Sequence, residues 1–141
     1  MLYLLDTNVC VMFLNGRSTL VRDRLLSTPT DAMAICSVVK AELFYGALRS
    51  KNPAQTLERQ QLFLGKFTSL LFDDGAALAA GRIRANLANL GTPIGPYDLQ
   101  IAAIAQVNNL TLVTHNTREF DRVDGLQLED WELAAESSEA G

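Results

Sequence analysis

The first thirteen residues, MLYLLDTNVCVMF (residues 1–13), place a carboxylate, a hydroxyl and an amide inside an otherwise apolar segment. The apolar run 2–5 is typical of a short buried strand. Residues 8–15 follow as a short helix, with Thr7 or Asn8 as its N-cap and Gly16 after its end. Asp6 therefore lies between a strand and a helix. Ligands of open α/β sheets bind beyond the carboxyl ends of the strands, so Asp6 is either part of such a site or a helix cap.

The rest of the chain continues this alternation of short apolar runs and amphipathic segments. Strands alternating with helices predict an α/β fold with a central, mostly parallel sheet and helices on both faces. Further strands are expected at 32–36, 70–72, 110–114 and 126–130. Helices are expected at 18–28, at 38–50 with Ser37 as cap, at 54–70 after Pro53, at 73–90 before Gly91, and at 97–109 after Pro96, with a short turn or helix at 116–123.

The composition indicates one domain followed by an acidic tail. The chain has 141 residues, 48% of them hydrophobic, which is enough for a single core. From Glu129 onward there are five acids and no base, so residues 1–128 hold 11 of the 16 acids against all 12 bases. We expect a domain over 1–131 and a disordered tail over 132–141. No apolar run is long enough for a membrane helix, there is no signal-peptide pattern, and two cysteines without CxxC spacing favour the cytoplasm.

Two further carboxylates fall on helix faces that are otherwise apolar. Glu42 shares a predicted helical face with Val38, Val39, Tyr45 and Gly46. A glutamate on such a face costs desolvation free energy unless a cation or a hydrogen bond meets it. The alternative is a glutamate whose head reaches solvent at the edge of the stripe.

Asp98 repeats the pattern in the first turn of its helix, on the stripe of Ile101, Ala102 and Ala105. Taken alone, it could simply interact with the helix macrodipole. Together with Asp6 and Glu42, however, it forms a set of carboxylates that would repel one another. A divalent cation relieves that repulsion, and oxygen donors suit Mg²⁺ or Mn²⁺. A zinc site is disfavoured because the chain has a single His. Carboxylate sites with Mg²⁺ or Mn²⁺ hydrolyse phosphodiesters.

A fourth polar group follows the predicted strand 110–114. Thr114, Asn116 and Thr117 are uncharged, and Glu119 adds a carboxylate. Turn-forming residues alone would explain the segment, since Asn and Thr readily cap and turn. His115 is the only histidine, and without a Ser or Cys partner it is expected to be exposed or structural.

These segments resemble PIN-domain ribonucleases, and in particular the VapC toxins of bacterial type II toxin–antitoxin modules. The resemblance rests on LLDTNV, AELFYGAL, GTPIGPYDLQIAAIA and LVTHNTREFDRVDGLQLEDW, in the family's order and spacing over residues 1 to about 131. It implies a PIN-like fold with an acidic Mg²⁺- or Mn²⁺-dependent site. By motif, Asp6, Glu42 and Asp98 are the metal ligands, while Thr7 and Asn8 hold Asp6 in place. Many PIN domains have Asp where this chain has Asn116, so Asn116 and Glu119 are expected to assist, with Thr114 in support.

The resemblance also implies partners and a substrate class. VapC toxins are inhibited by a VapB antitoxin that enters the active-site groove, and they usually form dimers. Relatives with a similar GTPIGPYD segment cleave initiator tRNA in the anticodon stem–loop, so RNA, and tRNA within it, is the expected substrate.

Basic residues are expected to contact the RNA backbone, because phosphate contacts supply much of the affinity for nucleic acids. The candidates are Arg17, Lys40, Arg49, Lys51, Arg82, Arg84 and Arg118, each of which could equally be a solvated surface charge. Two functional alternatives remain at this stage: a PIN-fold binding module without catalysis, and a nuclease for other RNA or for DNA. An aspartyl phosphotransferase of the haloacid-dehalogenase type would need Asp at position 8, which is Asn.

Overall fold

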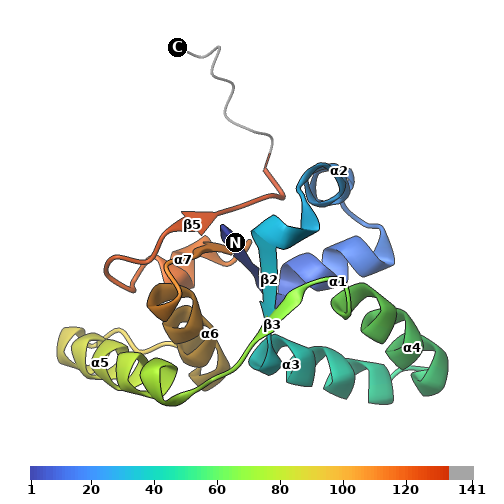
Figure 1. Ribbon diagram of the computed structural model, residues 1–141. Coiled ribbons are helices and arrows are strands. Elements are labelled where there is room, and N and C mark those ends of the chain that lie inside the picture. Colours follow the sequence, from blue (N-terminus) through green and yellow to red (C-terminus); the bar gives the residue numbers. More distant parts are fainter. Residues whose placement is uncertain (134–141) are drawn as a thin grey trace, which may run out of the picture.

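A five-stranded sheet forms the centre of the molecule, in the computed structural model that describes residues 1–133 (Figure 1). All strand pairs are parallel, in the order β3-β2-β1-β4-β5. The predicted parallel α/β architecture is confirmed. The elements, in chain order, are β1 (Tyr3–Leu5), α1 (Thr7–Asn15), α2 (Thr19–Ser27), the 3-10 turn η1 (Thr30–Ala32), β2 (Met33–Cys36), α3 (Ser37–Leu48), α4 (Pro53–Leu64), β3 (Thr68–Leu70), α5 (Asp74–Leu90), α6 (Pro96–Val107), β4 (Thr111–Val113), α7 (Thr117–Phe120) and β5 (Leu128–Glu129).

The strand order places a topological switch point beside β1. The chain moves outward from β1 to β2 and β3, then returns to place β4 on the other side of β1 and β5 beyond it. Right-handed crossovers carry helices to one face on the outward path and to the opposite face on the return. Accordingly α1 to α4 lie on one side of the sheet and α5 and α6 on the other (Figure 1). The crevice expected for a ligand lies where β1 and β4 end.

Burial of the central strands and of α6 fixes this arrangement. Leu4 and Leu5 in β1 and Leu112 and Val113 in β4 are fully buried. Five consecutive residues of α6, from Ile101 to Ala105, are also fully buried, so this helix is apolar on all sides at its middle. Because the sheet and α6 cannot shift without exposing this core, the side chains at their ends are held in rigid positions.

Three details of the predicted elements were wrong. Asp6 itself is the N-cap of α1, because its backbone is extended and its carboxylate accepts a hydrogen bond from Thr7 N. The N-cap position of α3 belongs to Cys36, and Ser37 is already helical. The helix predicted over 54–70 ends at Leu64, because residues 68–70 pair with residues 34–36 of β2; the expected strand over 70–72 lies correspondingly earlier.

The folded body extends to Trp131 within the described residues. The Trp131 side chain is buried, its ring centre lies 5.2 Å from that of Tyr3, and Arg24 lies 4.9 Å above it. The expected boundary after residue 131 stays a prediction, and residues 134–141 of the predicted tail lie outside the described part.

Two further features of the structure concern the cysteines and the length of the helices. Cys10 and Cys36 are unpaired and buried, and burial raises the pKa of both thiols, that of Cys36 to about 11. Within residues 1–133, no helix has the length and apolar character required to cross a bilayer.

Candidate active site

Asp6 and Thr114 join the two strands at the switch point. Asp6 follows β1 and Thr114 follows β4, and both side chains are buried. Thr114 Oγ1 donates a hydrogen bond to Asp6 Oδ2 at 2.8 Å, while Asp6 Oδ1 accepts from Thr7 N at 2.8 Å. Asp6 is therefore the cap of α1, and its other carboxylate oxygen is held by the residue that follows β4; its role in a ligand site stays a prediction.

Glu42 is connected to Asp6 through Thr7. Thr7 Oγ1 donates to Glu42 Oε1 at 2.9 Å, so Thr7 uses its backbone for Asp6 and its side chain for Glu42. Thr7 therefore contacts both carboxylates, whereas Asn8 is exposed; the supporting roles expected for the two residues stay predictions. The predicted helical face of Glu42 needs correction: Tyr45 and Gly46 are exposed, and Glu42 is half-buried at the margin of the core stripe.

Asp98 and Glu119 form the opposite wall. Their carboxyl groups are hydrogen-bonded to each other. Glu119 Oε1 also accepts from Gly95 N at 2.9 Å, and its Oε2 accepts from Asn116 Nδ2 at 2.8 Å. Asn116 thus orients Glu119, and Asn116 N donates a hydrogen bond to Thr114 Oγ1 at 3.0 Å. Among the polar residues after β4, Glu119 therefore supplies the carboxylate beside Asp98, and Asn116 is its hydrogen-bond donor.

The pKa shifts show that these four carboxylates influence one another. Burial is the largest cause raising the pKa of Asp6, the hydrogen bonds from Thr114 and Thr7 oppose it, and the charges of Glu42 and Glu119 add to it. Burial, followed by the hydrogen bond and the charge of Glu119, raises the pKa of Asp98 to about 7. The Gly95 N–H is the main cause lowering the pKa of Glu119. Because this value lies at neutral pH, Asp98 is about half protonated there, beside the ionised Glu119.

The donor set fits a divalent cation. Among the described residues, none of the four carboxylates forms a salt bridge with Lys, Arg or His. Four carboxylates with one shared proton therefore lack a counter-ion at their centre, and oxygen donors of this kind select hard cations. Within the described residues, no three of these carboxylates bring oxygens within 4.8 Å of one another.

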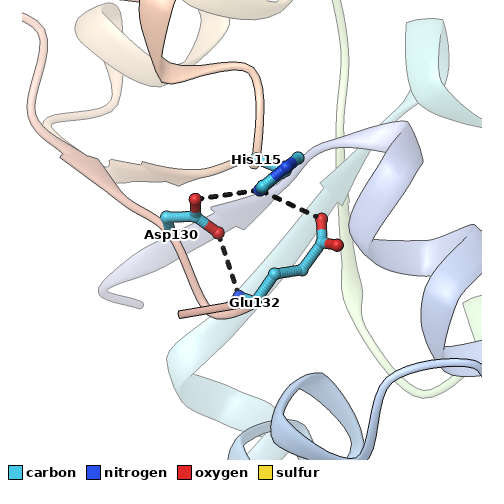
Figure 2. A group of neighbouring side chains, drawn as sticks. All are labelled: His115, Asp130 and Glu132. Carbon is cyan, nitrogen blue, oxygen red and sulfur yellow. Dashed lines mark hydrogen bonds and ion pairs between the residues drawn. The ribbon is translucent and has the colours of Figure 1, made fainter. Parts of the chain in front are cut away.

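A second polar cluster lies at the ends of β4 and β5. His115 Nδ1 is 2.9 Å from Asp130 Oδ2 and 3.5 Å from Glu132 Oε2, and Glu132 N donates to Asp130 Oδ1 (Figure 2). The ligand atoms of these three side chains lie within 4.8 Å of one another. Unlike the four carboxylates, they include a group that can carry positive charge. The expectation that His115 is exposed or structural agrees with this position, since it links two strand ends.

Comparison with known proteins identifies the family. A family model described as PIN domain matches residues 3–126. The tRNA(fMet)-specific endonuclease VapC of Salmonella typhimurium is 40% identical over 129 residues, which are 92% of this chain and 97% of the relative. The chain belongs to the VapC ribonucleases of the PIN-domain family. Ribonuclease VapC2 of Rickettsia felis is 38% identical, over 94% of this chain and 99% of the relative.

Solved structures agree with this assignment. A chain in the crystal structure of DNA-bound VapBC from Salmonella typhimurium matches with a TM-score of 0.87 and 41% identity, over 93% of this chain and 99% of that one. A chain in the structure of VapBC-1 from nontypeable Haemophilus influenzae matches with a TM-score of 0.85 and 33% identity, over 94% and 100%. The predicted PIN-like fold is confirmed.

One contributor to this VapC site was missed by sequence reasoning. Gly95 supplies a backbone N–H to Glu119, and a β-carbon built on it would lie 3.9 Å from both Asp98 Oδ2 and Glu119 Oε1. The only signal was the Gly-Pro step that opens α6, because a backbone donor leaves no residue-type signature.

The basic candidates come from several different elements of the fold. Arg49 is stacked beside Tyr45, Lys40 is half-buried, and Arg82 and Arg84 lie on the exposed side of α5. Their contacts to RNA stay predictions, as do those of the remaining exposed candidates, Arg17, Lys51 and Arg118.

Proposed function

We propose that this chain is a Mg²⁺- or Mn²⁺-dependent endoribonuclease toxin that hydrolyses RNA phosphodiesters and thereby inhibits translation. The observation that carries this proposal is the group of Asp6, Glu42, Asp98 and Glu119 near the switch point of the sheet, none of which forms a salt bridge among the described side chains. A cluster of this kind, in a chain of the VapC family, supports metal-assisted phosphodiester hydrolysis rather than acid–base catalysis by a lone residue.

Each side chain has a role in this proposal. Asp6, Glu42 and Asp98 would hold the cation, and Glu119 would assist from beside Asp98. Bound there, a divalent ion would polarise the scissile phosphate and acidify the attacking water. Asp98 must first give up the proton that it shares with Glu119.

The supporting residues orient these ligands. Thr114 and Thr7 fix Asp6 and Glu42 by the hydrogen bonds described above, and Asn116 fixes Glu119. Outer partners of this kind set ligand orientation and affinity. Attack by water would leave a 5′-phosphate and a 3′-hydroxyl on the cleaved RNA.

Initiator tRNA is the proposed target. Relatives from Salmonella typhimurium and Shigella flexneri, 40% and 42% identical to this chain, are named tRNA(fMet)-specific endonucleases. An anticodon stem–loop presents unpaired bases, the form of RNA that proteins read most readily by sequence. The proposed place of action is the cytoplasm, where that substrate is used.

A VapB-type antitoxin and a second copy of the chain are the proposed partners. The matching solved structures from Salmonella typhimurium and Haemophilus influenzae are VapBC complexes. In this chain, Tyr45 and Leu48 on α3 and Leu62 on α4 are exposed apolar side chains on helices that pack together, a surface suited to a partner.

The test is to induce the chain in bacteria with and without its neighbouring antitoxin gene and to map the 5′ ends of cellular RNA. We expect growth arrest and new ends in the initiator tRNA anticodon loop, suppressed by the antitoxin. An Asp98→Asn variant that folds should produce neither effect. New 5′ ends in another RNA would identify that RNA as the target in place of initiator tRNA. An unchanged RNA profile would support an inactive binding module instead.

A further inference from the structure

A cleft of about 630 Å³ lies between α3 and α6, and Glu42 is the member of the carboxylate cluster that lines it. Glu42 lines this cleft and is also the carboxylate that accepts from Thr7 Oγ1, so the two sites are continuous. The volume is within the range of about 300–1,000 Å³ that is typical of ligand sites. Whatever occupies the cleft therefore lies next to the phosphate that the carboxylates would act on.

Two tyrosines from separate helices face this cleft. Tyr45 of α3 is 63% exposed and Tyr97 of α6 is 59% exposed, although both are large aromatic side chains. Arg49 holds Tyr45 from the same helix: its Nη1 donates to Tyr45 Oη at 3.0 Å, and its guanidinium carbon is 5.7 Å from the ring centre. One ring is thus fixed in place and backed by a cation, as in surfaces that stack nucleic-acid bases.

The remaining lining matches the chemistry of a nucleobase. Ala41 adds a small apolar side chain to the lining, while Ser37 and Gln100 offer a hydroxyl and an amide. A base has apolar faces that stack on aromatic rings and polar edges that pair with such groups. We propose that this cleft binds an unpaired base adjacent to the scissile phosphate, stacked on Tyr97 and Tyr45. This inference rests on the proposed ribonuclease function.

The test uses the folded chain and an initiator-tRNA anticodon stem–loop whose cleavage position has been mapped. Each nucleotide within three positions of the cut is replaced in turn by an abasic nucleotide. For Tyr97→Ala we expect KM to rise about 10- to 100-fold with kcat changed less than about threefold, since stacking on one aromatic ring contributes on that scale. Tyr97→Phe should keep a KM near that of the wild type.

The decisive result is non-additivity between protein and RNA. One abasic position should weaken the wild type about as much as Tyr97→Ala does, and should have little further effect on that variant. Leu78→Ala is the matched control, because Leu78 is 59% exposed on α5 and does not line the cleft. Additive losses, or an unchanged KM for both Tyr97→Ala and Tyr45→Ala, would overturn the inference while leaving the ribonuclease intact.

The test also distinguishes two other occupants of the cleft, the antitoxin and a second copy of the chain. If Tyr97→Ala weakens antitoxin binding or dimerisation and leaves the KM for RNA unchanged, the cleft belongs to that partner and the inference is wrong. If the wild type cleaves no RNA, the proposed function itself fails, and this inference fails with it.

Discussion

Two groups of polar side chains at the same edge of the sheet differ in how their charge is balanced. At the ends of β4 and β5, Asp130 and Glu132 meet His115 Nδ1, which can carry the balancing charge. At the ends of β1 and β4, Asp6 and Asp98 are grouped with other carboxylates, and one proton is shared between Asp98 and Glu119. Within the described residues, the first cluster includes an ion-pair partner from the chain itself, whereas Asp6 and Asp98 form no salt bridge, and the proposed function places a cation there. Charge balance therefore separates a structural link from a candidate active site where acid content alone would not.

One amide substitution in each cluster should show the largest difference in RNA cleavage between the two clusters. Asp98→Asn removes a proposed ligand and should lower RNA cleavage by about 100-fold or more, a loss on the scale of a ligand or an essential charge. Asp130→Asn, in the other cluster, should change it by less than about threefold. Single-turnover cleavage assays measure both, with thermal melts to show that each variant folds. A large loss of cleavage in Asp130→Asn with little loss in Asp98→Asn would indicate that His115, Asp130 and Glu132 hold the catalytic metal.

The pH dependence of metal binding should follow the shared proton. Because the pKa of Asp98 is raised to about 7, the cation must displace a proton below that pH, and its affinity should fall up to about tenfold per pH unit. Mn²⁺ titration calorimetry from pH 5.5 to 8.5 measures this, together with about one proton released below pH 7. Glu119→Gln removes the charge that raises this pKa, so its profile should shift to lower pH. An affinity independent of pH would contradict the shared proton.

The same proton affects stability, with a definite sign. A carboxyl group whose pKa is raised on folding contributes stability below its unfolded value of 3.8, and that contribution is lost as the pH rises towards about 7. The lowered pKa of Glu119 acts in the opposite direction, at more acid pH. In the metal-free protein, the melting temperature should therefore decrease between pH 5 and 8, and Asp98→Asn should flatten the slope.

Removing the strand-to-strand hydrogen bond should have a smaller effect. Thr114→Val deletes the donor to Asp6 Oδ2 while keeping the buried shape, so the carboxylate loses orientation and its pKa rises further. We expect cleavage and metal affinity to fall about tenfold, and Thr114→Ser to restore them. Thr111→Val on the same strand is the control, since Thr111 Oγ1 only meets the exposed Gln127. Equal effects from the two valine variants would count against a specific role for Thr114.

The smallest effects on stability and cleavage are expected from His115→Ala, in the cluster of His115, Asp130 and Glu132. His115 is 56% exposed at its side chain, although its partner Asp130 is only 9% exposed, and ion pairs that reach solvent are worth about 0–1 kcal/mol. His115→Ala should therefore lower the free energy of unfolding by no more than about 1 kcal/mol in urea denaturation, and less in high salt. Its cleavage rate should equal that of the wild type; a loss of metal-dependent activity would show that the two clusters are not separate.

Much of the fold could be predicted because its signals are local. Apolar runs such as 2–5 and 110–114, and stops such as Gly16 and Gly91, depend on neighbouring residues only. The helix predicted over 54–70 failed beyond Leu64, because the strand at 68–70 is defined by its pairing with β2 and not by its own pattern. Tertiary pairing overrides local propensity in such short segments.

The carboxylates of the site were also within reach of the sequence, but their connections were not. Asp6, Glu42 and Asp98 interrupt apolar patterns and so stand out. The bond from Thr7 to Glu42 spans 35 positions and that from Gly95 to Glu119 spans 24, and no local pattern encodes such contacts. The same holds for the cleft between Tyr45 and Tyr97, which exists only because α3 and α6 pack together.

The most direct test of the central claim is cleavage of an initiator-tRNA anticodon stem–loop by the purified chain after treatment with a chelator. The account predicts no cleavage without a divalent ion, and restoration by Mg²⁺ or Mn²⁺ in the wild type but not in Asp98→Asn. The products should carry a 5′-phosphate and a 3′-hydroxyl. Cleavage that persists in the chelator, or that yields a 2′,3′-cyclic phosphate, would contradict metal-assisted hydrolysis at these carboxylates.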